Sequence, residues 1–321
     1  MSMMDVVMLT DAGETARAIV EREAPGTTVH LCDRYDALEG LLAATAAPVV
    51  YATKFAGGAG FPRAALMAAP ALRWISVGGS GTDHLAPWDP SRLTVTNAAG
   101  VSAGMMAEYV IGMMLSFSLD LAGHARRQAA RDWAPAKVAP VAGRRMLILG
   151  LGATGIAVAV RAKAMGMTVA GLRARPVPTP PLDEVHGIDA LTAELARADV
   201  LVCCLPLTDA TRGMIDAAAL AALPRGAILI DLSRGGVVDE PALLQALNDG
   251  HLAGAARDVF TTEPLPPEHP LWQAPNLRIT PHCSAVWDGW EEAAIAMFAR
   301  NLRRWRANEP LANVVDPARG Y

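Results

Sequence analysis

The sequence predicts an α/β protein with two doubly wound, mainly parallel sheets. Three observations lead to this prediction. At 321 residues the chain is long for one domain. Short apolar runs alternate with helical patterns along most of its length, which is typical of parallel strands joined by helices. A glycine-rich turn of the kind that follows the first strand of such a series lies near the middle of the chain, at residues 150–155.

The first alternating series occupies the N-terminal third of the chain. Its apolar runs are strand candidates, and they lie at residues 6–9, 29–31, 49–52, 74–77 and 93–96. Helical patterns separate several of them, at residues 12–23, 37–46 and 61–69. Because helical connections place helices on the faces of a parallel sheet, both faces of this sheet are expected to be covered.

The second series begins after a long predicted helix at residues 101–123 and a proline-broken connection at 129–143. Its predicted strands lie at residues 146–149, 168–172, 200–205, 227–232, 254–259 and 277–280. Its predicted helices lie at residues 154–165, 191–198, 216–222 and 240–248. Six strands with helical crossovers match a complete dinucleotide-binding sheet.

The position of the glycine turn predicts the domain organisation. The turn opens only the second series, and a last amphipathic helix at residues 288–308 follows that series. The simplest arrangement is a first domain of residues 1–97 joined by 287–321, with a second domain of residues 98–286 inserted between them. Ligands of such sheets bind at the carboxyl ends of the strands, so we expect the ligand to lie between the two domains.

The turn itself predicts a pyrophosphate site. Gly150 permits a tight reversal from strand to helix, Gly152 lets the backbone approach a phosphate, and Gly155 lets helix and strand pack closely. Ala153 and Thr154 begin the helix, whose first N–H groups and positive dipole end face the phosphates. The Thr154 hydroxyl is a further candidate phosphate contact. A plain strand-to-helix turn is the alternative, because one glycine motif is a weak signal.

Two arginines follow the second strand of this series. A dinucleotide-binding sheet that prefers NAD usually has Asp or Glu there, bonded to the ribose 2′-hydroxyl. Here the strand ends at Arg173, with Arg175 close behind, and no acidic residue occurs from 165 to 181. A guanidinium can bind a 2′-phosphate with two hydrogen bonds, so the sequence predicts NADP as the preferred cofactor. The alternative is that both arginines are solvated loop residues.

Three candidate catalytic residues follow three later strands. Arg234 lies in a glycine-rich turn, Glu263 lies beyond the next strand, and His282 lies beyond the last one. A carboxylate paired with an imidazole fixes its tautomer and favours its protonated form, which suits a general acid. A histidine alone is more often a core residue, and an arginine alone is often an exposed loop residue. Their combination at successive strand ends favours a catalytic site.

The chain resembles the D-isomer-specific 2-hydroxyacid dehydrogenases, in particular the short NADPH-dependent glyoxylate and hydroxypyruvate reductases. Several motifs in a fixed order carry this resemblance. They are the glycine turn, Leu205-Pro206-Leu207-Thr208 with Thr211, Ser233-Arg234-Gly235, Asp258-Val259-Phe260 with Glu263-Pro264, Thr280-Pro281-His282, and Gly79 to Asp83. The resemblance implies a Rossmann cofactor domain inserted into a flavodoxin-like substrate domain.

The resemblance also implies roles for individual residues. Arg234 would bind the carboxylate and carbonyl of a small 2-oxo acid, and His282, paired with Glu263, would protonate the carbonyl oxygen as hydride arrives from NADPH. The backbone N–H groups of Ser80 and Gly81 would bind the substrate carboxylate from the first domain. The other cofactor contacts implied are Leu205, Pro206, Thr211, Leu232, Ser233, Asp258 and Ser284.

Bulk properties restrict the partners. A net charge of −4 gives no indication of nucleic-acid binding, and no segment has the length and apolarity of a membrane span. The four cysteines lack metal-ligand spacing, so we expect reduced thiols, no metal and a cytoplasmic location. Relatives of this kind are usually homodimers, and the methionine-rich predicted helix at 101–123 offers a surface for such contact.

The specific substrate stays open at this point. The leading interpretation is an NAD(P)-dependent enzyme that reduces glyoxylate, hydroxypyruvate or a related 2-oxo acid, with NAD as a possible cofactor besides NADP. One alternative is another reaction of the family, such as phosphoglycerate or D-lactate oxidation. Another is a nucleotide-sensing protein without enzymatic activity, built on the same fold.

Overall fold

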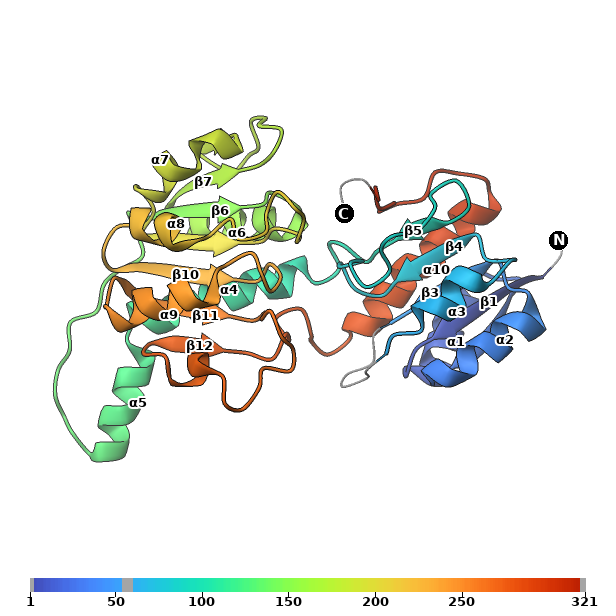
Figure 1. Ribbon diagram of the computed structural model, residues 1–321, viewed down its shortest axis with the longest axis horizontal. Helices are drawn as coiled ribbons and strands as arrows, with labels where there is room; N and C mark the ends of the chain where they lie inside the picture. The colour runs from blue at the N-terminus through green and yellow to red at the C-terminus, as the bar shows by residue number, and fades with distance from the viewer. Residues whose placement is uncertain (1–2, 54–59, 318–321) are drawn as a thin grey trace. The chain divides into compact units, whose positions relative to one another are not determined.

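The computed structural model describes residues 3–53 and 60–317. The chain folds into two units, one formed by Met1–Val101 with Trp287–Tyr321 and the other by Ser102–Val286. Each unit contains one sheet, in which all strand pairs are parallel, and helices on both faces (Figure 1). The predicted fold class is therefore confirmed.

The first unit has a five-stranded sheet in the order β2-β1-β3-β4-β5, which is the flavodoxin-like order. An isolated antiparallel bridge between Thr96 and Val314 joins the C-terminal segment to this unit. Its elements are β1 (Met4–Leu9), α1 (Gly13–Glu23), β2 (Thr27–Cys32), the 3₁₀ helix η1 (Tyr35–Ala37), α2 (Leu38–Thr45), β3 (Val49–Ala52), α3 (Arg63–Ala68), β4 (Trp74–Val77), β5 (Thr94–Thr96) and α10 (Trp290–Arg306).

Alternating strand residues of the first unit enter two apolar layers. Val7 and Leu9 of β1 pack beneath α2 and α3, whereas Val6 and Met8 pack beneath α1 and α10. Because α10 supplies Phe298 and other buried residues to the second layer, the C-terminal helix is part of the core of the first unit.

The second unit has a seven-stranded sheet in the order β12-β11-β10-β9-β6-β7-β8, which is the Rossmann order with one further strand. Its elements are α4 (Ala103–Ser118), α5 (Leu121–Ala130), β6 (Arg145–Leu149), α6 (Ala153–Ala164), β7 (Thr168–Leu172), β8 (Glu184–His186), the 3₁₀ helix η2 (Ile188–Ala190), α7 (Leu191–Leu195), β9 (Val200–Cys203), α8 (Ala217–Ala222), β10 (Ala227–Asp231), α9 (Glu240–Asn248), β11 (Leu252–Arg257), the 3₁₀ helix η3 (Pro270–Gln273) and β12 (Leu277–Ile279).

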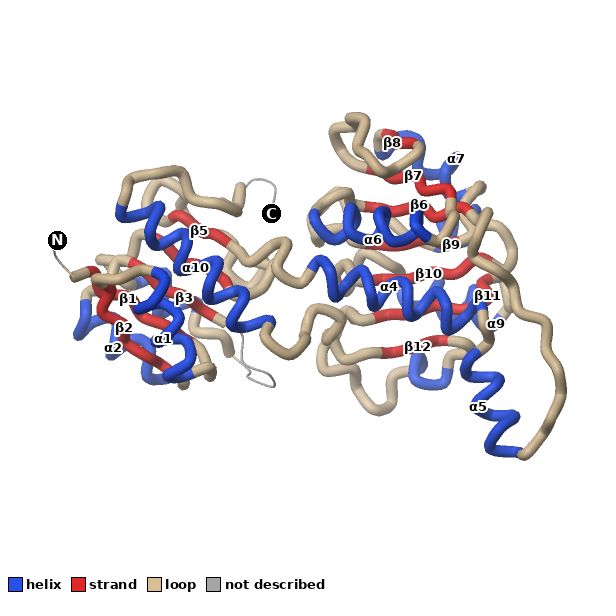
Figure 2. The backbone as a smooth tube through the Cα atoms, turned by 180° about the vertical axis from the view of Figure 1, so that it is seen from behind, coloured by secondary structure: helices blue, strands red, loops and turns tan. Residues whose placement is uncertain are grey.

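The two faces of this sheet carry different helices. Figure 2 shows α4 and α6 on the face nearer the viewer, and their apolar residues pack on Met146 and Ile148 of β6. Leu147 and Leu149 of the same strand point to the other face, where α7, α8 and α9 cover them. Strands buried on both faces explain why each appears in the sequence as an apolar run.

The predicted helix at residues 101–123 is wrong in its extent. The structure has two helices there, α4 and α5, and α5 continues to Ala130. The break lies at Asp120, whose φ of +46° is outside the helical region and whose side chain accepts a hydrogen bond from the N–H of Gly123. Asp120 therefore caps α5 instead of continuing α4. None of the described helices is alone long and apolar enough to cross a membrane, although α4 and α5, bent by 55°, pass those criteria as a pair.

Strand β8, at the edge of the sheet, is not predicted by the sequence. It is three residues long and polar, and it pairs with β7 through Glu184, Val185 and His186. The predicted strands at 200–205, 254–259 and 277–280 end before their predicted limits, so the residues after them lie in loops. Several of the candidate functional residues are in these loops.

Candidate functional site

The predicted residues of the second unit gather along one edge of its sheet. They follow strands β6, β7, β9, β10, β11 and β12, which are all parallel. The carboxyl ends of parallel strands meet at the same edge, so side chains more than a hundred residues apart in the sequence lie along one line of loops.

The glycine turn between β6 and α6 has the geometry that its sequence predicts. Gly150 has a φ of +94°, and its N–H donates to the carbonyl of Leu172 at 3.1 Å. A Cβ atom at Gly155 would overlap the carbonyl oxygen of Gly150, so only glycine allows this packing. A Cβ atom at Gly152 would meet no atom within 4 Å, which leaves open space in front of the exposed start of α6.

The first turn of α6 can bind an anion. Ile156 is the first residue whose N–H donates within the helix, to the carbonyl of Gly152. The N–H groups before it, including those of Ala153 and Thr154, have no such intrahelical acceptor. The Thr154 hydroxyl donates to the sulfur of Met106 on α4 at 3.6 Å, so in this structure it links two helices instead of facing the open space.

The two arginines after β7 lie at the same edge. The backbone N–H of Arg173 donates to the carbonyl of His186 at 3.2 Å, which fixes the start of the loop beside β8. Arg173 is half-buried and Arg175 is exposed. Among the described residues, no hydrogen bond or ion pair engages either guanidinium, so both can bind an anion.

Arg234 lies in the loop after β10. Asp231, the fully buried last residue of that strand, accepts hydrogen bonds from both the backbone N–H and the hydroxyl of Ser233. Burial raises the pKa of Asp231, while the nearby guanidinium of Arg257 and the bonds from Ser233 lower it. The half-buried Arg234 follows directly, and its Nη1 donates to the carbonyl of Ser233 at 2.9 Å.

Glu263 and His282 form a hydrogen-bonded pair across two loops. His282 Nδ1 lies 2.7 Å from Glu263 Oε2, and Glu263 Oε1 accepts the backbone N–H of Phe260 at 2.9 Å. The His282 side chain is 43% exposed and that of Glu263 32%, so the imidazole is accessible to solvent. With the proton on Nδ1 donated to Glu263, Nε2 is the ring nitrogen left to exchange a proton with a ligand.

The buried Asp258 carboxylate holds the loop that carries His282. Its Oδ1 accepts the Thr280 hydroxyl at 2.6 Å and the Cys283 N–H at 2.9 Å, and its Oδ2 accepts the Ser284 N–H at 2.9 Å. The hydroxyl of Tyr109 on α4 contacts the Thr280 hydroxyl at 2.8 Å. Tyr109 is not foreseeable from the sequence, since only the fold brings α4 to the end of β12.

The remaining candidates of this unit differ in accessibility. Leu205 and Pro206 are half-buried in the loop after β9. The Thr211 hydroxyl donates to the carbonyl of Pro206 at 2.7 Å and accepts the Thr208 N–H, so its main observed contact is within this loop. Leu232, Ser233 and Ser284 are buried.

Ser80 and Gly81 belong to the first unit and follow β4. The Ser80 carbonyl accepts the side-chain amide of Asn97 at 2.7 Å. Among the described residues, no hydrogen bond engages the N–H groups of Ser80 or Gly81, so this loop has two donors at the carboxyl edge of the first sheet.

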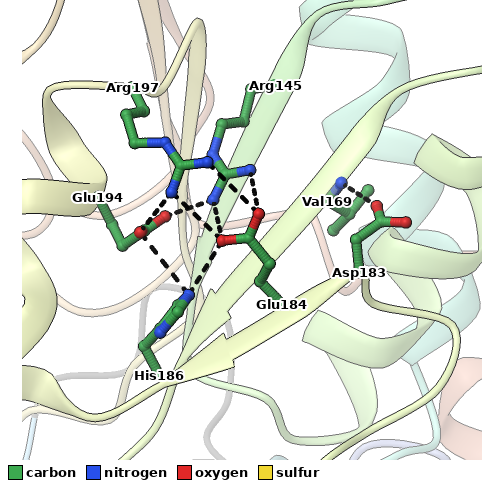
Figure 3. Close-up of polar contacts among 7 residues, drawn as sticks. All are labelled: Arg145, Val169, Asp183, Glu184, His186, Glu194 and Arg197. Atoms are coloured by element: carbon green, nitrogen blue, oxygen red, sulfur yellow. Dashed lines mark hydrogen bonds and ion pairs between the residues drawn. The ribbon is translucent and has the colours of Figure 1, made fainter.

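A further polar cluster lies around β8 (Figure 3). Glu184, His186 and Glu194 place ligand atoms within 4.8 Å of one another, a spacing that suits a metal ion. Arg145 contacts Glu184 at 2.8 Å and Glu194 at 2.5 Å, and Arg197 contacts Glu194 at 2.9 Å. Hydrogen bonds to Glu184 from Arg145, His186 and Arg197, in that order of effect, lower the pKa of Glu184 to about 2. Two guanidinium groups already balance the two carboxylates, so the cluster is an ionic network that fixes the edge strand.

Comparison with known proteins gives the family. Residues 111–284 match the model of the D-isomer specific 2-hydroxyacid dehydrogenase NAD binding domain. The glycerate dehydrogenase of Methylorubrum extorquens is 34% identical over 261 residues, which cover 77% of this chain and 80% of the relative.

Two solved structures are similar over nearly their whole length. A D-isomer specific 2-hydroxyacid dehydrogenase from Xanthobacter autotrophicus, in complex with NADPH and MES, has a TM-score of 0.86 and 32% identity, covering 100% of both chains. The NADPH-dependent glyoxylate/hydroxypyruvate reductase from Sinorhizobium meliloti, in complex with NADP and sulfate, has a TM-score of 0.85 and 28% identity, covering 99% of this chain and 100% of that one. The chain therefore belongs to the D-isomer specific 2-hydroxyacid dehydrogenases, a family of NAD(P)-dependent oxidoreductases.

Proposed function

We propose that this enzyme reduces a small 2-oxo acid of the glyoxylate or hydroxypyruvate type to the D-2-hydroxy acid, with NADPH as reductant and His282 as general acid. The observation that carries this proposal is the 2.7 Å contact between His282 and Glu263. It lies one strand away from the loop of Arg234, so a proton donor and a fixed cation occur at one edge of the sheet. The similarity to a reductase solved with NADP supports the choice of substrate and cofactor.

The second unit fits a dinucleotide by its own geometry. The open space at Gly152 and the free first turn of α6 suit a pyrophosphate, which would accept N–H bonds from Ala153, Thr154 and Gly155. We therefore assign residues 98–286 to the cofactor and residues 1–97 with 287–321 to the substrate. The further cofactor contacts that we assign are Gly150, Leu205, Pro206, Thr211, Leu232, Ser233, Asp258 and Ser284.

Arg173 and Arg175 support a preference for NADP. Both guanidinium groups lie after β7, where the ribose of a dinucleotide bound at the glycine turn would be. A guanidinium attracts the 2′-phosphate that distinguishes NADP from NAD, and no carboxylate from residue 165 to 181 is present to repel it. NAD lacks this phosphate and would bind more weakly.

The chemistry of the protein residues follows from their contacts. The nicotinamide supplies the hydride. Arg234 binds the substrate carboxylate and polarises its 2-oxo group. In the first unit, the backbone N–H groups of Ser80 and Gly81 are further candidate donors to a carboxylate. Glu263 accepts from Nδ1 of His282, so the imidazolium donates its Nε2 proton to the carbonyl oxygen that becomes the hydroxyl.

An assay with purified enzyme tests this function. NADPH oxidation is measured with glyoxylate, hydroxypyruvate and other 2-oxo acids, and NAD(P) reduction is measured with D-lactate and phosphoglycerate. We expect reduction of one of the first two, and a turnover rate lower by roughly 100- to 10,000-fold for His282→Ala. Turnover only with D-lactate or phosphoglycerate would favour the other dehydrogenase reactions. NADPH binding without turnover of any acid would favour a nucleotide sensor.

The cofactor preference has a separate test. The ratio of kcat/KM for NADPH to that for NADH is compared between wild type and Arg173→Asp. We expect a decrease of about 10- to 100-fold, because charge-assisted hydrogen bonds are lost and a repulsive charge is added. Lys163→Asp is the control, since it makes the same change of charge in the same unit, at a side chain paired with Asp183. An unchanged ratio in Arg173→Asp would refute the assignment.

We also assign a homodimer and a cytoplasmic location. Trp133 is 99% exposed after α5, and Leu121 at the start of α5 is also exposed. An apolar surface of this kind suits contact with a second copy of the chain. Light scattering after size exclusion should give a dimer for wild type and a monomer for the double variant Trp133→Asp, Leu121→Asp, while Val177→Asp serves as control.

The cysteines suit the assigned cytoplasmic location. All four are free thiols, as a reducing compartment requires.

A further inference from the structure

Arg257 is the last residue of β11, and its side chain is fully buried. Fully buried arginines are rare, because removing a guanidinium from water is costly unless carboxylates compensate its charge. Arg257 is also absent from the motifs that relate this chain to its family. A residue of this kind at the carboxyl edge of the sheet requires an explanation.

Two carboxylates surround the Arg257 guanidinium. Nη2 lies 3.3 Å from Oδ2 of Asp231, and Nη1 lies 3.3 Å from Oε1 of Glu240. The guanidinium carbon lies 5.1 Å from the centre of the Phe260 ring, within the range of a cation–π contact. None of the three guanidinium nitrogens makes a well-oriented hydrogen bond with the described residues, so charge is the main component of these contacts.

Each carboxylate is bonded to a different loop of the candidate site. Asp231 accepts the N–H and hydroxyl of Ser233, the residue before Arg234. Glu240 accepts the N–H of Thr261 at 2.9 Å and its hydroxyl at 3.1 Å, two residues before Glu263. Among the described residues, Arg257 is therefore the cation that contacts both acceptors, and through them it connects the Arg234 loop to the Glu263 loop.

The two loops are also in direct contact. A Cβ atom at Gly235 would overlap the backbone of Phe260 and Thr261. At such close approach a small displacement of one loop displaces the other, because packed protein segments do not deform freely. The charge contacts of Arg257 and the direct contact between the two loops thus both restrict movement of one loop relative to the other.

Stability alone does not explain this arrangement. Replacement of buried ion pairs by apolar residues of similar size often stabilises a protein, so a buried pair is weak evidence for a stabilising role. A buried charge network does restrict the positions of the groups bonded to it. The geometry therefore favours a positioning role over a purely structural one.

We propose that Arg257 is a positioning residue that holds the loops of Arg234 and Glu263 in one relative arrangement. This arrangement aligns Arg234, which binds the substrate carboxylate, with Glu263, which contacts His282. The proposal rests on the proposed function for its kinetic readout. Its structural readout does not depend on that function.

The structural readout is hydrogen–deuterium exchange of the full-length protein, compared between wild type and Arg257→Met. Methionine matches the length of the apolar part of the side chain and removes the charge. We expect backbone exchange at residues 232–238 and 259–263 to be at least tenfold faster, with the α6 turn at 150–156 unchanged. Arg278→Met is the matched control. Arg278 also lies over a phenylalanine ring, that of Phe117, but it is in β12 and contacts neither Asp231 nor Glu240. Unchanged exchange in both loops would overturn the proposal.

The kinetic readout separates positioning from loss of fold. With glyoxylate or the 2-oxo acid that wild type turns over, Arg257→Met should raise KM and lower kcat, giving at least a tenfold lower kcat/KM. Arg257→Lys should restore part of this loss, since an ammonium can reach one carboxylate but not both. A variant with faster unfolding but wild-type kcat and KM would show that Arg257 is structural only.

Two outcomes keep the proposals distinct. If Arg257→Met does not fold, Arg257→Lys alone tests the proposal, and wild-type kinetics and loop exchange in it would overturn the positioning role. If wild type turns over no 2-oxo acid, the proposed function fails, while the exchange measurement still decides whether Arg257 couples the two loops.

Discussion

The hydroxyl of Tyr109 lies 2.8 Å from the hydroxyl of Thr280, and this contact joins α4 to the loop that carries His282. The Thr280 hydroxyl donates its one hydrogen to Asp258 at 2.6 Å. The hydrogen shared with Tyr109 therefore comes from the tyrosine. Burial raises the pKa of Tyr109, so its hydroxyl keeps its proton at neutral pH.

We expect Tyr109→Phe to loosen this loop. The variant removes one buried hydrogen bond, which corresponds to about 1 kcal/mol in the free energy of unfolding. The substrate should also be reduced several-fold more slowly at saturation, because the loop of the proposed acid loses a restraint. Urea unfolding and steady-state kinetics measure both effects. The control is Tyr51→Phe, since the buried Tyr51 hydroxyl has no hydrogen-bond partner among the described residues. Equal effects of the two substitutions would contradict the role of the contact.

Replacement of the carboxylate beside His282 should slow the reaction. Glu263→Gln keeps an oxygen that can accept a hydrogen bond but removes the negative charge 2.7 Å from Nδ1. The hydrogen bond to His282 then has a neutral acceptor, which holds the imidazole less strongly, so kcat should fall by roughly 10- to 100-fold. The measurement is kcat at saturating substrate for wild type and variant. A wild-type kcat in Glu263→Gln would show that the charge of Glu263 is not needed.

The glycines of the phosphate turn should separate cofactor binding from stability. A Cβ atom at Gly155 would overlap the carbonyl oxygen of Gly150, whereas one at Gly152 would meet no protein atom. Gly155→Ala should therefore lower the free energy of unfolding by about 1–3 kcal/mol. Gly152→Ala should change it by less than about 1 kcal/mol and weaken NADPH binding at least tenfold. Chemical denaturation and calorimetric titration test this, and an opposite order of effects would contradict the assignment.

The first unit should become less stable as the pH rises from about 4.5 to about 7. Burial, the charge of Asp11 and a hydrogen bond to it raise the pKa of Glu291 to about 7, from an ordinary value of 4.5. Below pH 4.5 the group is protonated in both the folded and unfolded states. Between pH 4.5 and 7 only the unfolded chain releases the proton, so the free energy of unfolding falls, and above pH 7 the loss stays constant.

Glu291→Gln should remove this loss. The variant cannot ionise, so it should be more stable than wild type at about pH 8 and similar to it at about pH 4.5, as measured by urea unfolding. Glu309→Gln is the control, because it removes a negative charge from an exposed residue of the same unit. If Glu291→Gln and wild type lost stability in parallel between these pH values, the Asp11–Glu291 contact would not be the cause.

The sequence predicts strands and helices where burial on both faces determines the residue types. Leu147 and Leu149 face one layer and Met146 and Ile148 the other, so β6 is apolar throughout. Strand β8 is instead determined by polar contacts with segments distant in the sequence. Glu184 and His186 pair with β7 while they contact Arg145, Glu194 and Arg197, which come from other segments, and no local pattern records such contacts (Figure 3).

The candidate site shows the same division. Arg234, Glu263 and His282 follow strands whose parallel order the alternating pattern predicts, so their common edge was foreseeable. Arg257 and Tyr109 act through groups distant in the sequence. A single arginine at the end of an apolar strand gives no sign of burial between Asp231 and Glu240, because that environment exists only after β10, β11 and α9 have packed.

The backbone of His282 has a φ of +52°, a region that L-amino acids adopt at a cost of about 1–2 kcal/mol and that glycine adopts without it. Its exposed contact with Glu263 offsets at most about 1 kcal/mol. Glycine at this position is therefore expected to give a protein at least as stable and without the proposed acid. Selection of variant libraries for heat resistance alone would drive this position away from histidine, so only a screen that scores turnover as well can retain it.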